Sequence, residues 1–438
     1  MPVQYSIAGG GAEAIAASVE EGIARGALAP GAALPPIRGL AQQLGVNPNT
    51  VAAAYRLLRD RGAVESSGRR GTRVRDRPAT TPRSLRGLAV PPGVRDLSTG
   101  NPNPALLPAI AAVPARPGPV VLYGHPPIAS ALAEHAAAEL AADGVPADHL
   151  AVTSGALDGI ERVLSAHLRP GDRVAVEDPG WPNLLDLLGA LGLTPEPVGV
   201  DDDGPLPADL ARALQRGVRA VVVTSRAQNP TGAAVSAERA DALGALLADS
   251  EVLLVEDDHG AAIAGVPLHP LAGVSRHWAF IRSAAKAYGP DLRLAVLAGD
   301  QRTVERVQGR QRLGPGWVSH LLQNLAVELW RDDAATRRVA EAEAAYRAAR
   351  LGLCAALADR GVIAHGRSGL NVWIPVPDEA VAMTALFAAG WAAAPGARFR
   401  IRATAGLRVT IAELAPADVD ALADAVAAAV RGPGRASV

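Results

Sequence analysis

The chain has 438 residues, which predicts two or three domains rather than one. With 49% hydrophobic and 20% charged residues, the composition is that of a globular protein with a sizeable core. The net charge of −1 is the sum of +4 in residues 1–77 and −5 in the remainder. A basic segment on an acidic protein favours a polyanionic partner, but the same imbalance is common by drift in small domains.

Membrane, secreted and disulfide-bonded classes are disfavoured. No apolar run reaches membrane-spanning length, and the first ten residues lack the basic and apolar stretches of a secretory signal. Cys354 is the only cysteine, which excludes an intramolecular disulfide and a multi-cysteine metal site. We therefore expect a cytoplasmic protein without a metal site.

Residues 1–75 predict a small domain that begins with three helices. Apolar residues recur at helical spacing over 12–25, and a second helix is expected at 37–44. Asn47-Pro48 is typical of an N-cap followed by proline at the first helical position, so a third helix should run from there to about residue 61.

A hairpin and a linker follow these helices. Two strand-like pieces within 64–74 enclose a tip rich in glycine and arginine. Residues 76–93 hold four prolines and no apolar periodicity, which predicts a stiffened linker.

Residues 94–438 change to apolar strands that alternate with helices. This pattern is typical of an α/β domain with a mainly parallel sheet covered on both faces. A long helix at 332–358 then leads to a smaller α+β subdomain, about 332–432. The expected strands are 150–152, 174–176, 218–224, 252–255, 279–281 and 294–297 in the larger part, and 371–375 and 407–411 in the smaller part, before a closing helix at 416–430.

The N-terminal domain resembles the winged helix-turn-helix of GntR-type regulators. The resemblance runs over 12–75, through Leu34-Pro35-Pro36-Ile37-Arg38-Gly39-Leu40-Ala41 to the Arg70-Gly71-Thr72 wing. Such a domain offers the start of its third helix to base edges and uses basic groups on phosphates, which predicts a double-stranded DNA operator. An inert helix-turn-helix is the alternative. The candidate DNA contacts are Arg38, Asn47, Asn49, Thr50, Tyr55, Arg69, Arg70 and Thr72.

A single lysine marks the chemistry of the larger domain. Of the 43 lysines and arginines, only Lys286 is a lysine. Arginine replaces lysine readily on a surface, but its guanidinium stays protonated and cannot form an imine. Pyridoxal phosphate needs such a lysine, a carboxylate at the pyridine nitrogen, a side chain stacked on the ring and a phosphate cradle.

Candidates for these roles follow successive strands. Ser154-Gly155-Ala156 opens a helix whose N–H groups and dipole suit a phosphate. A carboxylate pair, Asp257-Asp258, ends a buried strand. Asp257 is the choice for the pyridine nitrogen and Asp258 remains the alternative.

The order of these motifs resembles fold type I aminotransferases. The matching stretches are Asp178-Pro179-Gly180-Trp181-Pro182, Asn229-Pro230-Thr231-Gly232 and Ser283-Ala284-Ala285-Lys286 with Arg293. The resemblance implies that Trp181 stacks on the cofactor, that Asn229 bonds its phenolic oxygen, and that Ser283 and Arg293 clamp its phosphate. It further implies that Arg408 binds a ligand carboxylate and that Tyr123 reaches the cofactor of the second subunit in a homodimer.

Winged helix, linker and aminotransferase-like domain together resemble the MocR branch of the GntR regulators. This implies a regulator that senses an amino compound or pyridoxal phosphate itself through an imine on Lys286. Several positions depart from the branch. His259 stands in place of a tyrosine that bonds the phenolic oxygen, and the others are Leu157, Ser225, Ile128, Ala133 and Asn371.

These departures place turnover in question and leave three interpretations. The preferred one is a sensor whose domain rearrangement alters DNA affinity. The second is an active aminotransferase with an accessory DNA-binding domain. The third is a dimerisation domain that has lost the cofactor.

Overall fold

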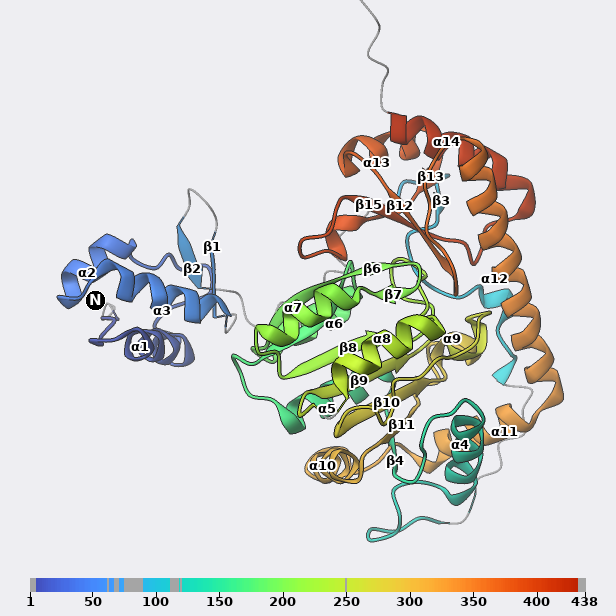
Figure 1. Ribbon diagram of the computed structural model, residues 1–438, viewed down its shortest axis with the longest axis horizontal. Helices are drawn as coiled ribbons and strands as arrows, with labels where there is room; N and C mark the ends of the chain where they lie inside the picture. The colour runs from blue at the N-terminus through green and yellow to red at the C-terminus, as the bar shows by residue number, and fades with distance from the viewer. Residues whose placement is uncertain are drawn as a thin grey trace, which may run out of the picture. The chain divides into compact units, whose positions relative to one another are not determined.

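The computed structural model describes residues 5–60, 63–66, 71–74, 90–110, 118, 120–248 and 250–431 (Figure 1). Two of the predicted DNA contacts, Arg69 and Arg70, and most of the predicted linker lie outside these residues.

The N-terminal part contains the three expected helices and the hairpin. The helices are α1 (Ala12–Ala24), α2 (Ile37–Leu44) and α3 (Pro48–Asp60), and β1 (Val64–Ser66) pairs antiparallel with β2 (Thr72–Val74). Gly45 ends α2 with a φ of 66°, a left-handed conformation that glycine adopts without strain. Apolar side chains from all three helices and both strands form one core, which includes Ile15, Val51, Leu58, Val64 and Val74. The first turn of α2 is exposed and does not contribute to this core.

An eight-stranded sheet forms the centre of the larger part. Its strand order is β4-β11-β10-β9-β8-β5-β6-β7. The strands β8, β9 and β10 run parallel, whereas β11 is antiparallel to both of its neighbours. The bounds are β4 (Leu150–Thr153), β5 (Arg173–Asp178), β6 (Thr194–Asp201), β7 (Gly204–Pro205), β8 (Ala220–Thr224), β9 (Leu253–Asp258), β10 (His277–Ser283) and β11 (Ala295–Gly299).

Helices cover this sheet, as its continuous apolar strands require. One large core joins the sheet to α4 (Ser130–Ala142), α7 (Pro207–Gln215), α8 (Ala237–Leu247) and α11 (His320–Arg331). Separately from that core, α5 (Ala156–His167) and α10 (Gln301–Arg312) pack on each other and on β10. The mainly parallel sheet is therefore present as predicted.

A smaller C-terminal subdomain begins in the long helix α12 (Asp333–Asp359) (Figure 1). Its sheet has the order β12-β15-β14, and α13 and α14 pack on it around a second apolar core. The bounds are β12 (Asn371–Pro375), α13 (Glu379–Ala388), β13 (Trp391–Ala392), β14 (Ala394–Pro395), β15 (Gly406–Thr410) and α14 (Val419–Arg431).

The start of the larger domain also belongs to this subdomain. Arg95–Asp96 forms β3, which pairs parallel with β13, and Leu97 lies in the C-terminal core. The chain that leaves the linker is thus fixed first to the C-terminal subdomain, which the sequence pattern did not predict.

Among the described residues, none of the helices combines the length and apolar character needed to cross a membrane.

Candidate cofactor and ligand site

The predicted chemical residues meet at one edge of the large sheet. Asp257 is near the end of β9, Ser283 ends β10, and Lys286 lies in the short helix α9 (Ala285–Tyr288) directly after it. Asn229 lies in the turn that follows β8. Because these strands are parallel, their carboxyl ends point to the same edge, where ligands of α/β proteins bind.

Lys286 is partly buried and its Nζ donates to the carbonyl of Gly100 at 2.5 Å. Burial lowers the pKa of Lys286 to about 8, and the nearby guanidinium of Arg408 acts in the same direction. Both effects disfavour the ammonium form. Lys286 therefore has an unusually large fraction of neutral amine, the form that attacks a carbonyl carbon.

The two neighbouring aspartates have different surroundings. Asp258 is fully buried and accepts hydrogen bonds from Arg226 at 3.0 and 2.8 Å and from Arg282 at 3.0 Å. Asp257 bonds His259 through Oδ2, whereas its Oδ1 is buried and has no hydrogen-bond partner among the described residues. A buried carboxylate oxygen without a donor is costly, so it suits a ligand that brings an N–H. The geometry favours Asp257 over Asp258 for a protonated pyridine nitrogen.

His259 forms a hydrogen bond with Asp257. Its Nδ1 lies 2.8 Å from Asp257 Oδ2, and its ring is roughly parallel to that of Trp181, with centroids 6.1 Å apart. Burial acts to lower the pKa of His259, but the carboxylate of Asp257 outweighs it and the net direction is upward. The carboxylate of Asp257 thus favours the charged form of His259, a contact that the sequence comparison with a tyrosine did not suggest.

The expected phosphate cradle is partly assembled. Gly155 has a φ of 97° at the turn from β4 into α5, and Arg293 donates from Nη2 to the carbonyl of Ser154 at 2.7 Å. A Cβ at position 155 would lie 2.6 Å from that guanidinium, so the close approach needs glycine. Ser283 Oγ accepts from the N–H of Ala285 at the start of α9. Ala156 is the first residue of α5, so the guanidinium of Arg293 lies at a helix start, an arrangement that suits an oxyanion.

Arg408 is a buried cation with neutral partners. It is 5% exposed on β15 and donates to Asn229 Oδ1 at 3.0 Å and to the carbonyl of Ser98 at 2.5 Å. Its Nε has no hydrogen-bond partner among the described residues. Burial lowers the pKa of Arg408 to about 9, with Arg398 as a further cause. An anionic ligand group would relieve this cost.

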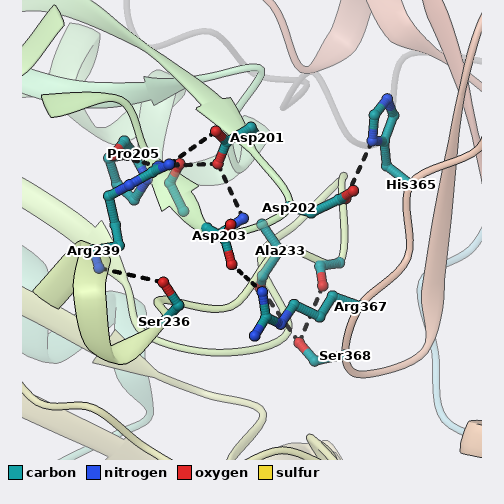
Figure 2. Close-up of polar contacts among 12 residues, drawn as sticks. Asp201, Asp202, Asp203, Pro205, Ala233, Ser236, Arg239, His365, Arg367 and Ser368 are labelled. Atoms are coloured by element: carbon teal, nitrogen blue, oxygen red, sulfur yellow. Dashed lines mark hydrogen bonds and ion pairs between the residues drawn. The ribbon is translucent and has the colours of Figure 1, made fainter. Parts of the chain in front are cut away.

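The turn that carries Asn229 is clamped by the C-terminal subdomain (Figure 2). Ser368 Oγ accepts from the N–H of Ala227 at 2.7 Å and donates to the carbonyl of Gly232 at 3.1 Å. Beside it, His365 Nδ1 lies 3.1 Å from Asp202, and Arg367 pairs with Asp203. These contacts hold Asn229 where it meets Arg408.

Tyr123 does not lie with the other site residues in this single chain. Its side chain is 93% exposed, and its described ring contact is the edge-on approach to Trp317 at 5.7 Å.

Several site residues had escaped the sequence patterns. Arg226 and Arg282 saturate Asp258, and the carbonyls of Ser98 and Gly100 hold Arg408 and Lys286. The turn-forming sequence from Ser98 to Pro102 predicts a bend, but only the tertiary structure shows what its carbonyls contact.

The predicted DNA-contacting residues divide into two groups. Arg38, Asn47 and Asn49 are exposed, and Asn47 Oδ1 accepts from the N–H of Asn49 at 2.8 Å, as an N-cap residue does at a helix start. Thr50 and Thr72 are partly exposed. Tyr55, however, is 2% exposed and donates its hydroxyl to the carbonyl of Pro35 at 2.7 Å. The prediction that Tyr55 contacts DNA was wrong, because the ring fills the core of the domain.

Comparison with known families agrees with a DNA-binding site in the N-terminal domain and a cofactor site in the larger domain. Residues 11–74 match the bacterial regulatory proteins of the gntR family, and residues 94–426 match aminotransferase class I and II. The vitamin B6 salvage pathway transcriptional repressor PtsJ of Salmonella typhimurium is 41% identical over 414 residues, which cover 93% of this chain and 95% of PtsJ. The chain belongs to the MocR-type regulators of the GntR family.

Further relatives agree with this assignment. The pyridoxine biosynthesis regulator PdxR of Corynebacterium glutamicum is 31% identical over 58% of each chain. The kynurenine aminotransferase of Pyrococcus horikoshii superposes with a TM-score of 0.69 at 20% identity and covers 77% of this chain and 91% of its own, which shows the fold. The predicted fold type I architecture is confirmed, and the aminotransferase match supports pyridoxal phosphate as the cofactor.

Proposed function

We propose that this MocR-type regulator binds a DNA operator through α3 and the wing, and holds pyridoxal phosphate on Lys286 as the sensing group. The observation that carries the proposal is that the only lysine and Asp257, whose buried Oδ1 has no donor among the described residues, lie at the same edge of the sheet. Lys286 would hold the cofactor through Nζ, and Asp257 would hold the pyridine nitrogen.

The remaining residues supply position and selectivity. Ser154, Gly155, Ala156, Ser283 and Arg293 would hold the phosphate, Trp181 would cover the ring, and Asn229 would bond the phenolic oxygen. The cofactor, when bound, supplies an aldehyde that captures amines and a ring that withdraws electrons. The buried guanidinium of Arg408 supports an effector with a carboxylate, so an amino acid is the favoured class and the cofactor alone is the second.

The exposure of Tyr123 supports a homodimer in which this side chain serves the second subunit. A protein of this kind would work in the cytoplasm, where its DNA and cofactor are found.

The experiment is a titration of operator DNA with the purified protein, with and without pyridoxal phosphate, alongside the visible spectrum. We expect a cofactor absorption band and a change in DNA affinity, both absent from Lys286→Ala. A colourless protein whose DNA affinity is the same with and without the cofactor would support the dimerisation-domain interpretation. Repeated turnover of an amino donor and a keto acid would instead support the aminotransferase interpretation.

A further inference from the structure

The two cations expected to bind cofactor and ligand are both held by one short backbone segment. The carbonyl of Ser98 accepts from Arg408, and the carbonyl of Gly100 accepts from Lys286, both at 2.5 Å. The segment is shaped for this task. Asp96 Oδ1 accepts from the N–H and the hydroxyl of Ser98, and Gly100 has a φ of 72°. A Cβ on Gly100 would lie 3.0 Å from the guanidinium of Arg408.

The other end of the same segment anchors the linker. Arg95 donates its N–H to the carbonyl of Gly390 at 2.9 Å, and Leu97 donates to Ala392 at 2.9 Å. The Arg95 side chain lies over the ring of Trp391, 5.0 Å from its centroid, and pairs with Asp418. All of these partners belong to the C-terminal subdomain. The chain from the DNA-binding domain therefore enters the larger domain at a segment that ends in the ligand site five residues later.

We propose that residues 95–100 are the coupling element of the regulator: ligands at Lys286 and Arg408 displace the carbonyls of Gly100 and Ser98, and the altered segment changes how the linker leaves the C-terminal subdomain. This inference rests on the function proposed above. It adds the identity of the residues that transmit ligand binding from the site to the linker.

Competition for the two cations gives the physical basis. A Lys286 whose Nζ is bonded to the cofactor no longer donates to Gly100 as an ammonium. A ligand carboxylate at Arg408 would bring a negative charge and could accept two parallel hydrogen bonds from the guanidinium, neither of which the neutral carbonyl of Ser98 can do. Each carbonyl would thus lose its donor when its own cation takes up a ligand. Because a ligand shifts a conformational equilibrium only through different contacts in the two states, this exchange of partners is the difference that coupling requires.

The test separates signal transmission from ligand binding. Arg95→Pro removes the N–H that bonds Gly390 together with the contacts to Trp391 and Asp418, and it leaves Lys286 and Arg408 untouched. Proline is tolerated at the first residue of a strand, which is the position of Arg95. Arg360→Ala is the matched control, because it removes an arginine that pairs with Asp420 and Asp424 in the same subdomain and leaves the Arg95–Asp418 pair in place.

Operator affinity would be measured for each protein with pyridoxal phosphate as the probe, alone and with L-glutamate. In the parent and in Arg360→Ala we expect the cofactor to change the dissociation constant by a factor in the range of about 5–150. In Arg95→Pro the cofactor band should be retained, while that factor falls to about 1. Hydrogen exchange at residues 97–101 should become faster on cofactor binding in the parent.

The outcomes separate the coupling role of residues 95–100 from the proposed function. Parent and Arg95→Pro responding equally would overturn the coupling role alone. A parent with no cofactor band and no response would overturn the proposed function and the coupling role with it. If Arg95→Pro does not fold, Arg95→Ala must lower the response factor in the same direction, and an unchanged factor would overturn the coupling role.

Discussion

The lowered pKa of Lys286 predicts the pH dependence of cofactor capture. With a pKa of about 8, roughly one amine in eleven is neutral at pH 7, compared with about one in three thousand at the ordinary value of 10.5. The protein should therefore hold about 300-fold more reactive amine than an exposed lysine does. The rate at which the cofactor band develops should rise about tenfold per pH unit below pH 7 and level off above a midpoint near 8.

The assay is stopped-flow absorbance of the protein mixed with limiting pyridoxal phosphate at pH 6 to 10. Arg408→Gln provides the comparison, because removing the second cation should move the midpoint upward. A parent profile that still climbs tenfold per unit between pH 8.5 and 10 would refute the assigned environment of Lys286.

Three further predictions concern stability and DNA binding. Asp258→Asn should lower the free energy of unfolding in urea by about 3–5 kcal/mol, because it leaves the buried Arg226 without its anion and Arg282 with Asp143 alone. Asp424→Asn on the surface should change it little, and similar values for both would contradict the network. The hydrogen bond with Asp202 raises the pKa of His365, so its stabilising contribution should be complete below pH 6.5 and disappear as the pH rises through the raised value. His365→Ala should accordingly cost up to about 1 kcal/mol at pH 5.5 and nothing near pH 9, and an equal cost at both would show that charge is not involved. Arg38→Ala should weaken binding to specific and random DNA alike and reduce the salt slope by about one; an unchanged slope would remove Arg38 from the phosphate contacts.

The sequence predicted elements whose signal is local. The Asn47-Pro48 start of α3 is encoded in adjacent residues, and β12 has the predicted bounds. The strands β6 and β7 were missed. In β6 three prolines or glycines interrupt the apolar pattern, which weakens the signal of a buried strand.

In the candidate site, too, features with a local sequence signal could be predicted, whereas those set by tertiary contacts could not. Lys286 could be found because it is the only lysine, and the motifs around it have fixed spacing. The separate surroundings of Asp257 and Asp258 could not be predicted, because Arg226 and Arg282 reach Asp258 from two other parts of the chain. For Tyr55, motif position indicated DNA, whereas burial decides that it packs in the core.

The most direct test of the central claim is mass mapping of the protein after it is loaded with pyridoxal phosphate and reduced with borohydride. We predict one reduced adduct per chain on Lys286, with no adduct in Lys286→Ala. An adduct at the N-terminal amine alone, or none, would contradict the claim that Lys286 is the sensing residue.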